Sequence, residues 1–141
     1  MPTEPCPFCD LARVELIAEA GPCAAIWTNE PPAGSLMVIP KAHRETAWDL
    51  TPEEWSVTRD LLHEMMRRVG QSHQPDGWNI GWNVGEVGGQ SVLHAHCHLV
   101  PRYRDERHAG KGLRWWFKQP DNASLQARGA ATPARPLPPV P

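Results

Sequence analysis

Three histidines stand at alternate positions in the segment His94-Ala95-His96-Cys97-His98. Alternate side chains of a β-strand point to the same face, so this spacing predicts three imidazoles lining one face of a strand. Neighbouring imidazoles would be about 6.6 Å apart along the strand, close to the span of a phosphoryl group with its attacking and leaving atoms. A neutral imidazole is a competent nucleophile near pH 7, because its reference pKa is about 6.5. The pattern indicates nucleophilic chemistry at phosphorus through a phosphohistidine-type adduct.

Two other interpretations of these histidines remain open. A histidine on a strand is more often a hydrogen-bonded structural residue than a catalyst. A His-x-His pair can also place two nitrogens on one zinc ion. The backbones of His94 and His98 would be about 13 Å apart, so one ion is not expected to bind all three imidazoles. At least one imidazole is therefore left for other chemistry.

A second set of reactive side chains lies near the N-terminus, where two residues separate Cys6 from Cys9. This spacing is a standard half-site for tetrahedral zinc, which needs two further ligands from elsewhere in the chain. The alternatives are a reduced pair on a mobile N-terminus and a thioredoxin-like redox site, and no helix pattern begins at Cys9 to favour the latter. The other two cysteines, Cys23 and Cys97, are expected to be small buried residues.

Length and charge exclude several classes of protein. The 141 residues are enough for one domain with a single core, and the net charge of −2 argues against a general nucleic-acid binder. No apolar run approaches the roughly 20 residues of a membrane span, and the N-terminus does not resemble a signal peptide. Four cysteines without a disulfide pattern indicate a reducing compartment. We therefore expect a cytoplasmic protein without nucleic-acid or membrane partners.

The apolar runs predict the strands that must position the histidines. Gly21-Pro22 is predicted to form a turn between the first two strands, and a Gly-rich bend at 86–90 leads into the histidine strand. The predicted strands are 14–17, 24–27, 36–39, 77–84 and 94–100.

One long helix is predicted between the third and fourth strands. Thr51 is the expected N-cap, Pro52 occupies the first helical position and Glu54 completes a capping box. Apolar residues recur at steps of three and four until Gly70, where the helix is predicted to end. Strands in hairpin order around such a helix predict an α+β fold, with an antiparallel sheet of about five strands, one long helix and shorter helices.

The histidine segment resembles the motif of the histidine triad superfamily of nucleotide hydrolases and transferases. The resemblance covers roughly residues 5 to 103. It implies an α+β fold, a homodimer and cleavage of nucleoside phosphate derivatives at the α-phosphorus. The matching segments outside the triad are Val38-Ile39-Pro40-Lys41-x-His43, Asp49-Leu50, Asn83-x-Gly85, Gly89-Gln90-Ser91-Val92 and Pro101-Arg102.

The resemblance implies roles for the triad and for the bend before it. His96, the middle histidine, corresponds to the nucleophile that becomes nucleotidylated, and His98 to the member that contacts the phosphate. Gln90 and Ser91 fall on positions that bind the phosphate and the leaving-group side. Asn83 falls where the family places an amide near the scissile phosphate.

The resemblance also implies a nucleoside pocket and a metal site. Asn29 is a predicted ribose contact, and Trp27 is predicted to line the base pocket. Several bacterial members, like the related galactose-1-phosphate uridylyltransferases, complete a zinc site with a histidine at the Pro-Lys-x-His position and the first triad histidine. His94 would thus belong both to the catalytic triad and to a structural zinc site, and no organic cofactor is implied. The implied zinc ligands are Cys6, Cys9, His43 and His94.

The function implied is hydrolysis of nucleoside phosphoramidates or dinucleoside polyphosphates through a nucleotidyl-His96 intermediate. The partner is then a small nucleotide substrate. Three alternatives remain open: a nucleotidyl transferase to a phosphate acceptor, a zinc-stabilised nucleotide-binding module with little turnover, and a metal-dependent hydrolase. The histidine triad domain is expected over residues 1–110, and residues 111–141 are expected to form a C-terminal extension with a Pro-rich, disordered tail. Within that extension, three roles are open for Trp115-Trp116: covering the active site, joining a dimer interface, or packing within the chain.

Overall fold

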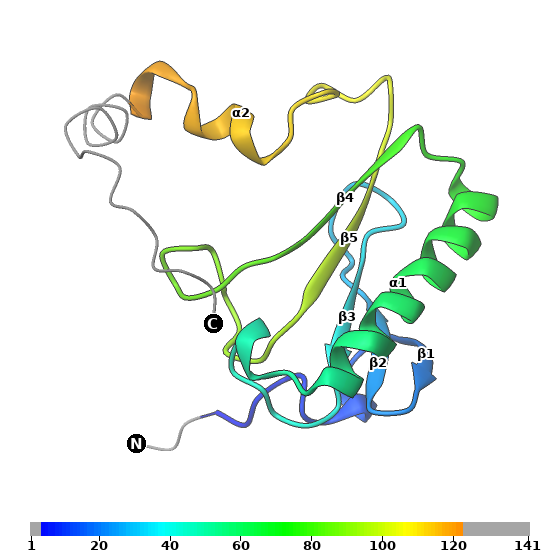
Figure 1. The fold of residues 1–141 in the computed structure, drawn as a ribbon. Helices are drawn as coiled ribbons and strands as arrows, with labels where there is room; N and C mark the ends of the chain where they lie inside the picture. The colour runs from blue at the N-terminus through cyan, green and yellow to red at the C-terminus, as the bar shows by residue number, and fades with distance from the viewer. Residues whose placement is uncertain (1–3, 123–141) are drawn as a thin grey trace, which may run out of the picture. The chain divides into compact units, whose positions relative to one another are not determined.

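The structure is a computed structural model that describes residues 4–122 (Figure 1). The chain divides into two compact units, Met1–Glu106 and Arg107–Pro141. The tail predicted to be Pro-rich and disordered, from residue 131 onward, lies outside the described residues. Within the described part of the chain, no helix is long and apolar enough to cross a membrane.

The first unit is built on one antiparallel sheet of five strands, in the order β1-β2-β3-β5-β4 (Figure 1). The long helix α1 and the short 3-10 helices η1 and η2 complete it. The predicted α+β fold is thereby confirmed. The bounds are η1 Leu11–Arg13, β1 Leu16–Ala20, β2 Cys23–Trp27, β3 Leu36–Pro40, η2 Ala47–Asp49, α1 Pro52–His73, β4 Gly77–Trp82 and β5 Cys97–Arg102.

Helix α1 begins as its sequence predicts. The Thr51 hydroxyl accepts a hydrogen bond from the Glu54 amide at 3.1 Å, and the Glu54 carboxylate accepts one from the Thr51 amide at 2.7 Å. The helix does not stop at Gly70, as predicted, but continues to His73. A glycine inside a helix costs about 1 kcal/mol without ending it. The residue that ends α1 is Gln74, whose φ of 50° is the left-handed cap conformation.

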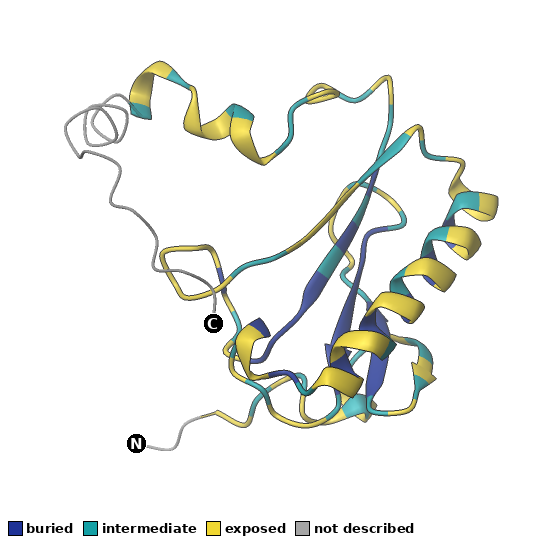
Figure 2. Cartoon of the chain, viewed as in Figure 1, coloured by how far each residue is buried: buried dark blue, intermediate teal, exposed yellow. Residues whose placement is uncertain are grey.

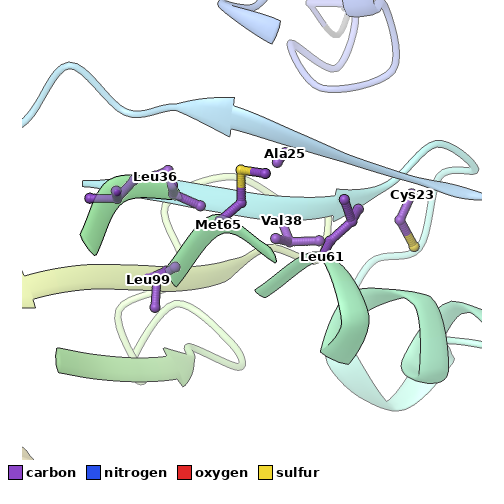
Figure 3. Close-up of a cluster of buried hydrophobic side chains, with 8 residues drawn as sticks. Cys23, Ala25, Leu36, Val38, Leu61, Met65 and Leu99 are labelled. Atoms are coloured by element: carbon purple, nitrogen blue, oxygen red, sulfur yellow. The ribbon is translucent and has the colours of Figure 1, made fainter. Parts of the chain in front are cut away.

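The two faces of the sheet are covered by different parts of the chain. Helix α1 packs on one face, and its outward side stays exposed (Figure 2). The segment before β1 covers the other face, where Phe8, Leu11 and Val14 pack against side chains of β2 and β3. The N-terminal cysteines are thus held at the face opposite α1. The core under α1 consists of Cys23, Ala25, Leu36, Val38, Leu61, Met65, Val69 and Leu99 (Figure 3).

Strand β5 begins at Cys97, so the prediction that all three histidines lie on one strand is wrong. Only His98 is within β5, and His94 and His96 precede it. The ladder between β3 and β5 runs from the pair Leu36–Leu99 to the pair Val38–Cys97 and then stops. Beyond that point the Ala95 amide donates to the Arg44 carbonyl at 2.6 Å instead of to β3. His94 and His96 therefore lie in a segment outside the sheet, directly before β5.

The other strand boundaries differ by small shifts. The first strand is Leu16–Ala20 rather than 14–17, because the chain turns tightly at Gly21, whose φ is +47°. The fourth strand ends at Trp82, two residues before its predicted end.

The described part of the second unit is short. It contains α2 (Leu113–Phe117) and the 3-10 helix η3 (Pro120–Asn122). The rings of Trp115 and Trp116 meet edge to face with their centroids 4.6 Å apart, and the Lys111 ammonium lies 4.5 Å from the Trp115 ring centroid. The proposed roles of Trp115-Trp116 stay predictions.

Candidate active site and metal centre

Two cysteines and two histidines from distant parts of the chain meet at one point. Their ligand atoms all lie within 4.8 Å of one another: Cys6 and Cys9 before η1, His43 after β3, and His94 before β5. The His94 Nδ1 atom is 3.4 Å from the Cys6 Sγ and 3.6 Å from the Cys9 Sγ, and the His43 Nδ1 is 3.2 Å from the Cys9 Sγ. Sulfur and nitrogen atoms on a tetrahedral zinc ion are about 3.5 Å apart. The predicted ligand set therefore has the chemistry and the spacing of a zinc site.

The His94 ring is oriented for metal binding by its second nitrogen. Its Nε2 lies 2.8 Å from the Pro40 carbonyl, which can only accept, so Nε2 carries the proton. The lone pair of Nδ1 is thereby directed at the two sulfurs. His94 is fully buried, and this burial lowers its pKa, which favours the neutral form that binds metals.

A hydrogen bond to a backbone carbonyl also orients the ring of His96, which lines a pocket rather than the metal site. Its Nδ1 lies 2.8 Å from the His94 carbonyl and must donate to it. The lone pair on Nε2 is therefore left for a ligand. Its ring stands nearly perpendicular to that of His98, with the centroids 5.0 Å apart. The carbonyl that orients His96 belongs to a metal-site residue, so the two sites are linked through one peptide group.

Both His96 and His98 line a pocket of about 550 Å³ between the N-terminal segment and the sheet. This volume is in the usual range for a small-molecule site. Ser91 adds a hydroxyl to the polar lining of this pocket, whereas Phe8, Ile26 and Met37 supply apolar surface. The arrangement can hold a planar apolar group next to an electrophile that faces His96. Among the other lining residues are Val14, Trp27, Thr28, Asn29, Glu30 and Arg13.

The sequence of the chain matches a known domain over most of this unit. Residues 12–105 match the family described as the HIT domain. The chain belongs to the HIT family. It is 30% identical over 105 residues to Protein hit of Bacillus subtilis, with 71% of this chain and 72% of the relative covered.

Other HIT relatives carry names that state an activity. Adenosine 5'-monophosphoramidase hnt1 of Schizosaccharomyces pombe is 27% identical, over 78% of this chain and 82% of that protein. AP-4-A phosphorylase of Mycobacterium tuberculosis is 34% identical over 71 residues, which are 50% of this chain and 36% of that protein.

Solved structures agree with the HIT assignment. The crystal structure of a HIT family protein from Bacillus anthracis has a TM-score of 0.71 and 28% identity, and covers 91% of this chain and 96% of its own. A Zn-bound histidine triad family protein from Mycobacterium smegmatis has a TM-score of 0.67 and 26% identity, with 90% and 97% covered.

In this HIT chain, five of the residues predicted from the sequence line the pocket. They come from two stretches that are far apart along the chain, 27–29 and 91–98. These residues are Trp27, Asn29, Ser91, His96 and His98.

The two predicted amide contacts, Gln90 and Asn83, have backbone partners instead. The Gln90 Nε2 donates to the carbonyls of Glu45, at 2.6 Å, and Val92, at 3.1 Å, and its Oε1 accepts from the Gly85 amide at 2.9 Å. The Asn83 Nδ2 donates to the Gly89 carbonyl at 3.3 Å. Both side chains hold the bend before the triad in shape, and their contact with a nucleotide stays a prediction.

Sequence reasoning missed Phe8. Its ring lies between the two metal-site cysteines in sequence and packs edge-on against His94, at 5.9 Å, and His96, at 5.5 Å. It also lines the pocket. Phe8 could have been predicted, because a residue between two metal ligands, Cys6 and Cys9, must lie next to the metal site.

The half-buried imidazole of His98 leads us to expect a pH dependence of stability. Burial, and then the neighbouring His96, lower its pKa, and Glu30 opposes them. The unfolded chain therefore takes up a proton at His98 near pH 6.5, while the folded chain does so only at lower pH. Stability is fully present above about pH 6.5 and falls below it, by at most about 1.4 kcal/mol per pH unit for this group.

This dependence is measured by thermal unfolding between about pH 7.5 and 5.5, for the wild type and His98→Gln. We expect a smaller loss of Tm on acidification in His98→Gln. Equal losses in the two proteins would show that His98 is not a source of the dependence.

Proposed function

We propose that this HIT protein hydrolyses nucleoside phosphoramidates or dinucleoside polyphosphates at the α-phosphate through a nucleotidyl-His96 intermediate. The observation that carries the proposal is the His96 imidazole, whose Nδ1 is bound to a carbonyl and whose Nε2 is left for the pocket. The names of HIT relatives, a monophosphoramidase and a dinucleoside polyphosphate phosphorylase among them, support a nucleotide substrate.

The proposed reaction has two displacements at phosphorus. The Nε2 lone pair of His96 attacks the α-phosphorus, the bond to the leaving nitrogen or oxygen breaks, and the leaving group keeps the electron pair and takes up a proton from solvent. Water then attacks the same phosphorus and releases a proton to solvent, the P–N bond to His96 breaks, and the neutral imidazole is restored. His98 and the Ser91 hydroxyl, on the same pocket, would donate hydrogen bonds to the phosphoryl oxygens as charge builds up on them.

The apolar part of the pocket fits the base of the nucleotide. Phe8, Ile26 and Met37 offer flat or flexible apolar surface, on which an aromatic base can stack. Trp27 and Asn29 also line the pocket, and we propose that Trp27 contacts the base and Asn29 the ribose. A base held here would leave its α-phosphate within reach of the imidazoles.

We propose that zinc occupies the site formed by Cys6, Cys9, His43 and His94. When bound, zinc supplies four coordinate bonds that join the N-terminal segment to the triad. The chain's own contribution is to orient the nucleophile, because the His94 carbonyl accepts the Nδ1–H of His96. The same cysteines hold Phe8 against the pocket.

The hydrolase and its rivals are separated by product analysis. The protein is incubated with an adenosine phosphoramidate or diadenosine tetraphosphate in ¹⁸O-water, with and without phosphate. A hydrolase yields AMP carrying one ¹⁸O atom in both cases, whereas a transferase yields a phosphate adduct, ADP, when phosphate is present. The similarity to a phosphorylase is what favours the second outcome. Binding of nucleotide without any product from either substrate would contradict both and favour a binding module.

We also propose that the chain forms a homodimer through α1 and β4. Strand β4 is an edge of the sheet, and a groove of about 370 Å³ beside it is lined by apolar side chains of both elements, among them Trp55, Ile80 and Trp82. Ile80 is 53% exposed, and the rings of Trp55 and Trp82 lie 5.3 Å apart. A second copy can cover this surface and pair with the free strand edge.

Light scattering during gel filtration tests the dimer. We expect twice the chain mass of 15.7 kDa for the wild type, and the single mass for Ile80→Arg. A monomeric wild type would overturn the proposed interface.

A further inference from the structure

An ion pair between the half-buried Arg44 and the buried Glu54 joins the loop after β3 to the first turn of α1. The Arg44 guanidinium makes three hydrogen bonds of 3.1 Å to the Glu54 carboxylate, two from Nε and one from an Nη atom. Glu54 is 2% exposed and also caps the Thr51 amide. Burial alone would raise the pKa of Glu54, but the hydrogen bonds from Arg44 and Thr51 outweigh it and hold this pKa below its ordinary value. The carboxylate is therefore charged and fully partnered.

The loop that carries Arg44 supports the active site through its backbone. Three of the carbonyls between residues 40 and 45 accept hydrogen bonds from the triad segment and the bend before it. The Pro40 carbonyl accepts from the His94 ring and the Arg44 carbonyl from the Ala95 amide. The Glu45 carbonyl accepts from the Gln90 side chain at 2.6 Å. Residues 40–45 thus fix the backbone position of the bend before Ser91 and of the triad segment after it.

We infer that Arg44 is a positioning residue for the reaction at His96: its ion pair with Glu54 holds the loop whose carbonyls set the backbone of the triad. The inference rests on the proposed function. The Ala95 amide bound by Arg44 follows directly on the His94 carbonyl that orients His96, so both belong to one peptide group. A shift of the loop is therefore passed to the nucleophile without any intervening side chain.

The forked shape of arginine is what this position requires. A lysine keeps the charge but presents a single nitrogen, so it cannot bind both carboxylate oxygens in a fixed plane. With lysine at position 44, a single nitrogen would bind the Glu54 carboxylate, and the orientation of the loop would be less constrained. A displacement of about 1 Å at a catalytic group can cost about 10²-fold in rate.

The chain contains a matched pair away from the site. Arg67 binds Glu64 through two hydrogen bonds, at 3.1 and 2.7 Å, on the exposed side of α1. Arg67→Lys therefore makes the same chemical change as Arg44→Lys without touching the loop or the triad.

The test compares kcat, KM and zinc content of Arg44→Lys and Arg67→Lys on the zinc-loaded protein. We expect Arg44→Lys to lower kcat by about 10- to 100-fold with KM within about threefold, and Arg67→Lys to match the wild type. A kcat of Arg44→Lys within twofold of the wild type would overturn the inference. If Arg44→Lys does not fold, Glu54→Gln, which keeps the volume and one acceptor oxygen, is measured against Glu64→Gln with the same expectation.

A readout without turnover separates this inference from the proposed function. NMR spectra of the ¹⁵N-labelled protein report the amide of Ala95 and the ring nitrogens of His96. We expect Arg44→Lys to move or broaden these signals well below its Tm, and Arg67→Lys to leave them unchanged. Unchanged signals in Arg44→Lys would refute the positioning role. A wild type that turns over no nucleotide would refute the proposed function alone, because the NMR comparison stands without it.

Discussion

His96→Ala lowers kcat by about 10⁴-fold or more and leaves nucleotide affinity within a few fold. The expectation follows from the position of the imidazole, which is 4% exposed and is directed into the pocket by its bond to the His94 carbonyl. His94 cannot replace it, since its Nδ1 faces the cysteines of the metal site. Removing the nucleophile abolishes the bond to phosphorus but leaves the apolar wall that would bind the base.

Steady-state kinetics and a fluorescence titration with AMP measure the two quantities. His108→Ala, which removes an imidazole from the second unit, is the matched control and is expected to behave like the wild type. More than a tenth of wild-type kcat in His96→Ala would contradict the proposed mechanism.

Cys9→Ser removes zinc and lowers Tm by about 10 °C or more. The change replaces a thiolate by a hydroxyl, which is a poor zinc ligand. Without a bound zinc ion, the remaining three ligands are no longer joined to one another. A loss of about 3–5 kcal/mol in the free energy of unfolding produces a shift of this size for a chain of this length. We also expect kcat to fall, because the N-terminal segment that carries Phe8 is no longer held at the pocket.

Metal analysis and calorimetry on the same samples test this. Cys23→Ala, at a buried cysteine of the core under α1, is the control and is expected to keep one zinc ion per chain. If zinc-free wild type unfolds at the same temperature as the zinc-loaded protein, the metal is not a structural element. If chelated protein is still folded and fully active, the metal-dependent hydrolase is excluded as well.

Local patterns in the sequence predicted local structure well. The start of α1 follows from Thr51, Pro52 and Glu54, because a capping box is formed by residues three apart and needs no tertiary partner. Its end was misplaced because Gly70 breaks the apolar pattern without breaking the helix.

Non-local contacts could not be predicted from spacing alone. The spacing of Cys6 and Cys9 predicts half of a metal site. The other two ligands, His43 and His94, were implied only by the resemblance to a family. Just before β5 begins, the Ala95 amide donates to the Arg44 carbonyl, a contact between distant residues that no periodicity of the sequence indicates. For the same reason the partners of Gln90, a carbonyl 45 residues away among them, were not foreseen.

Mass spectrometry of protein quenched during turnover of an adenosine phosphoramidate tests the nucleotidyl-His96 intermediate itself. We expect a covalent adduct of one nucleotidyl unit in the wild type, which peptide mapping places on His96, and no adduct in His96→Ala. Turnover without an adduct on rapid quenching, or an adduct on another residue, would contradict this intermediate.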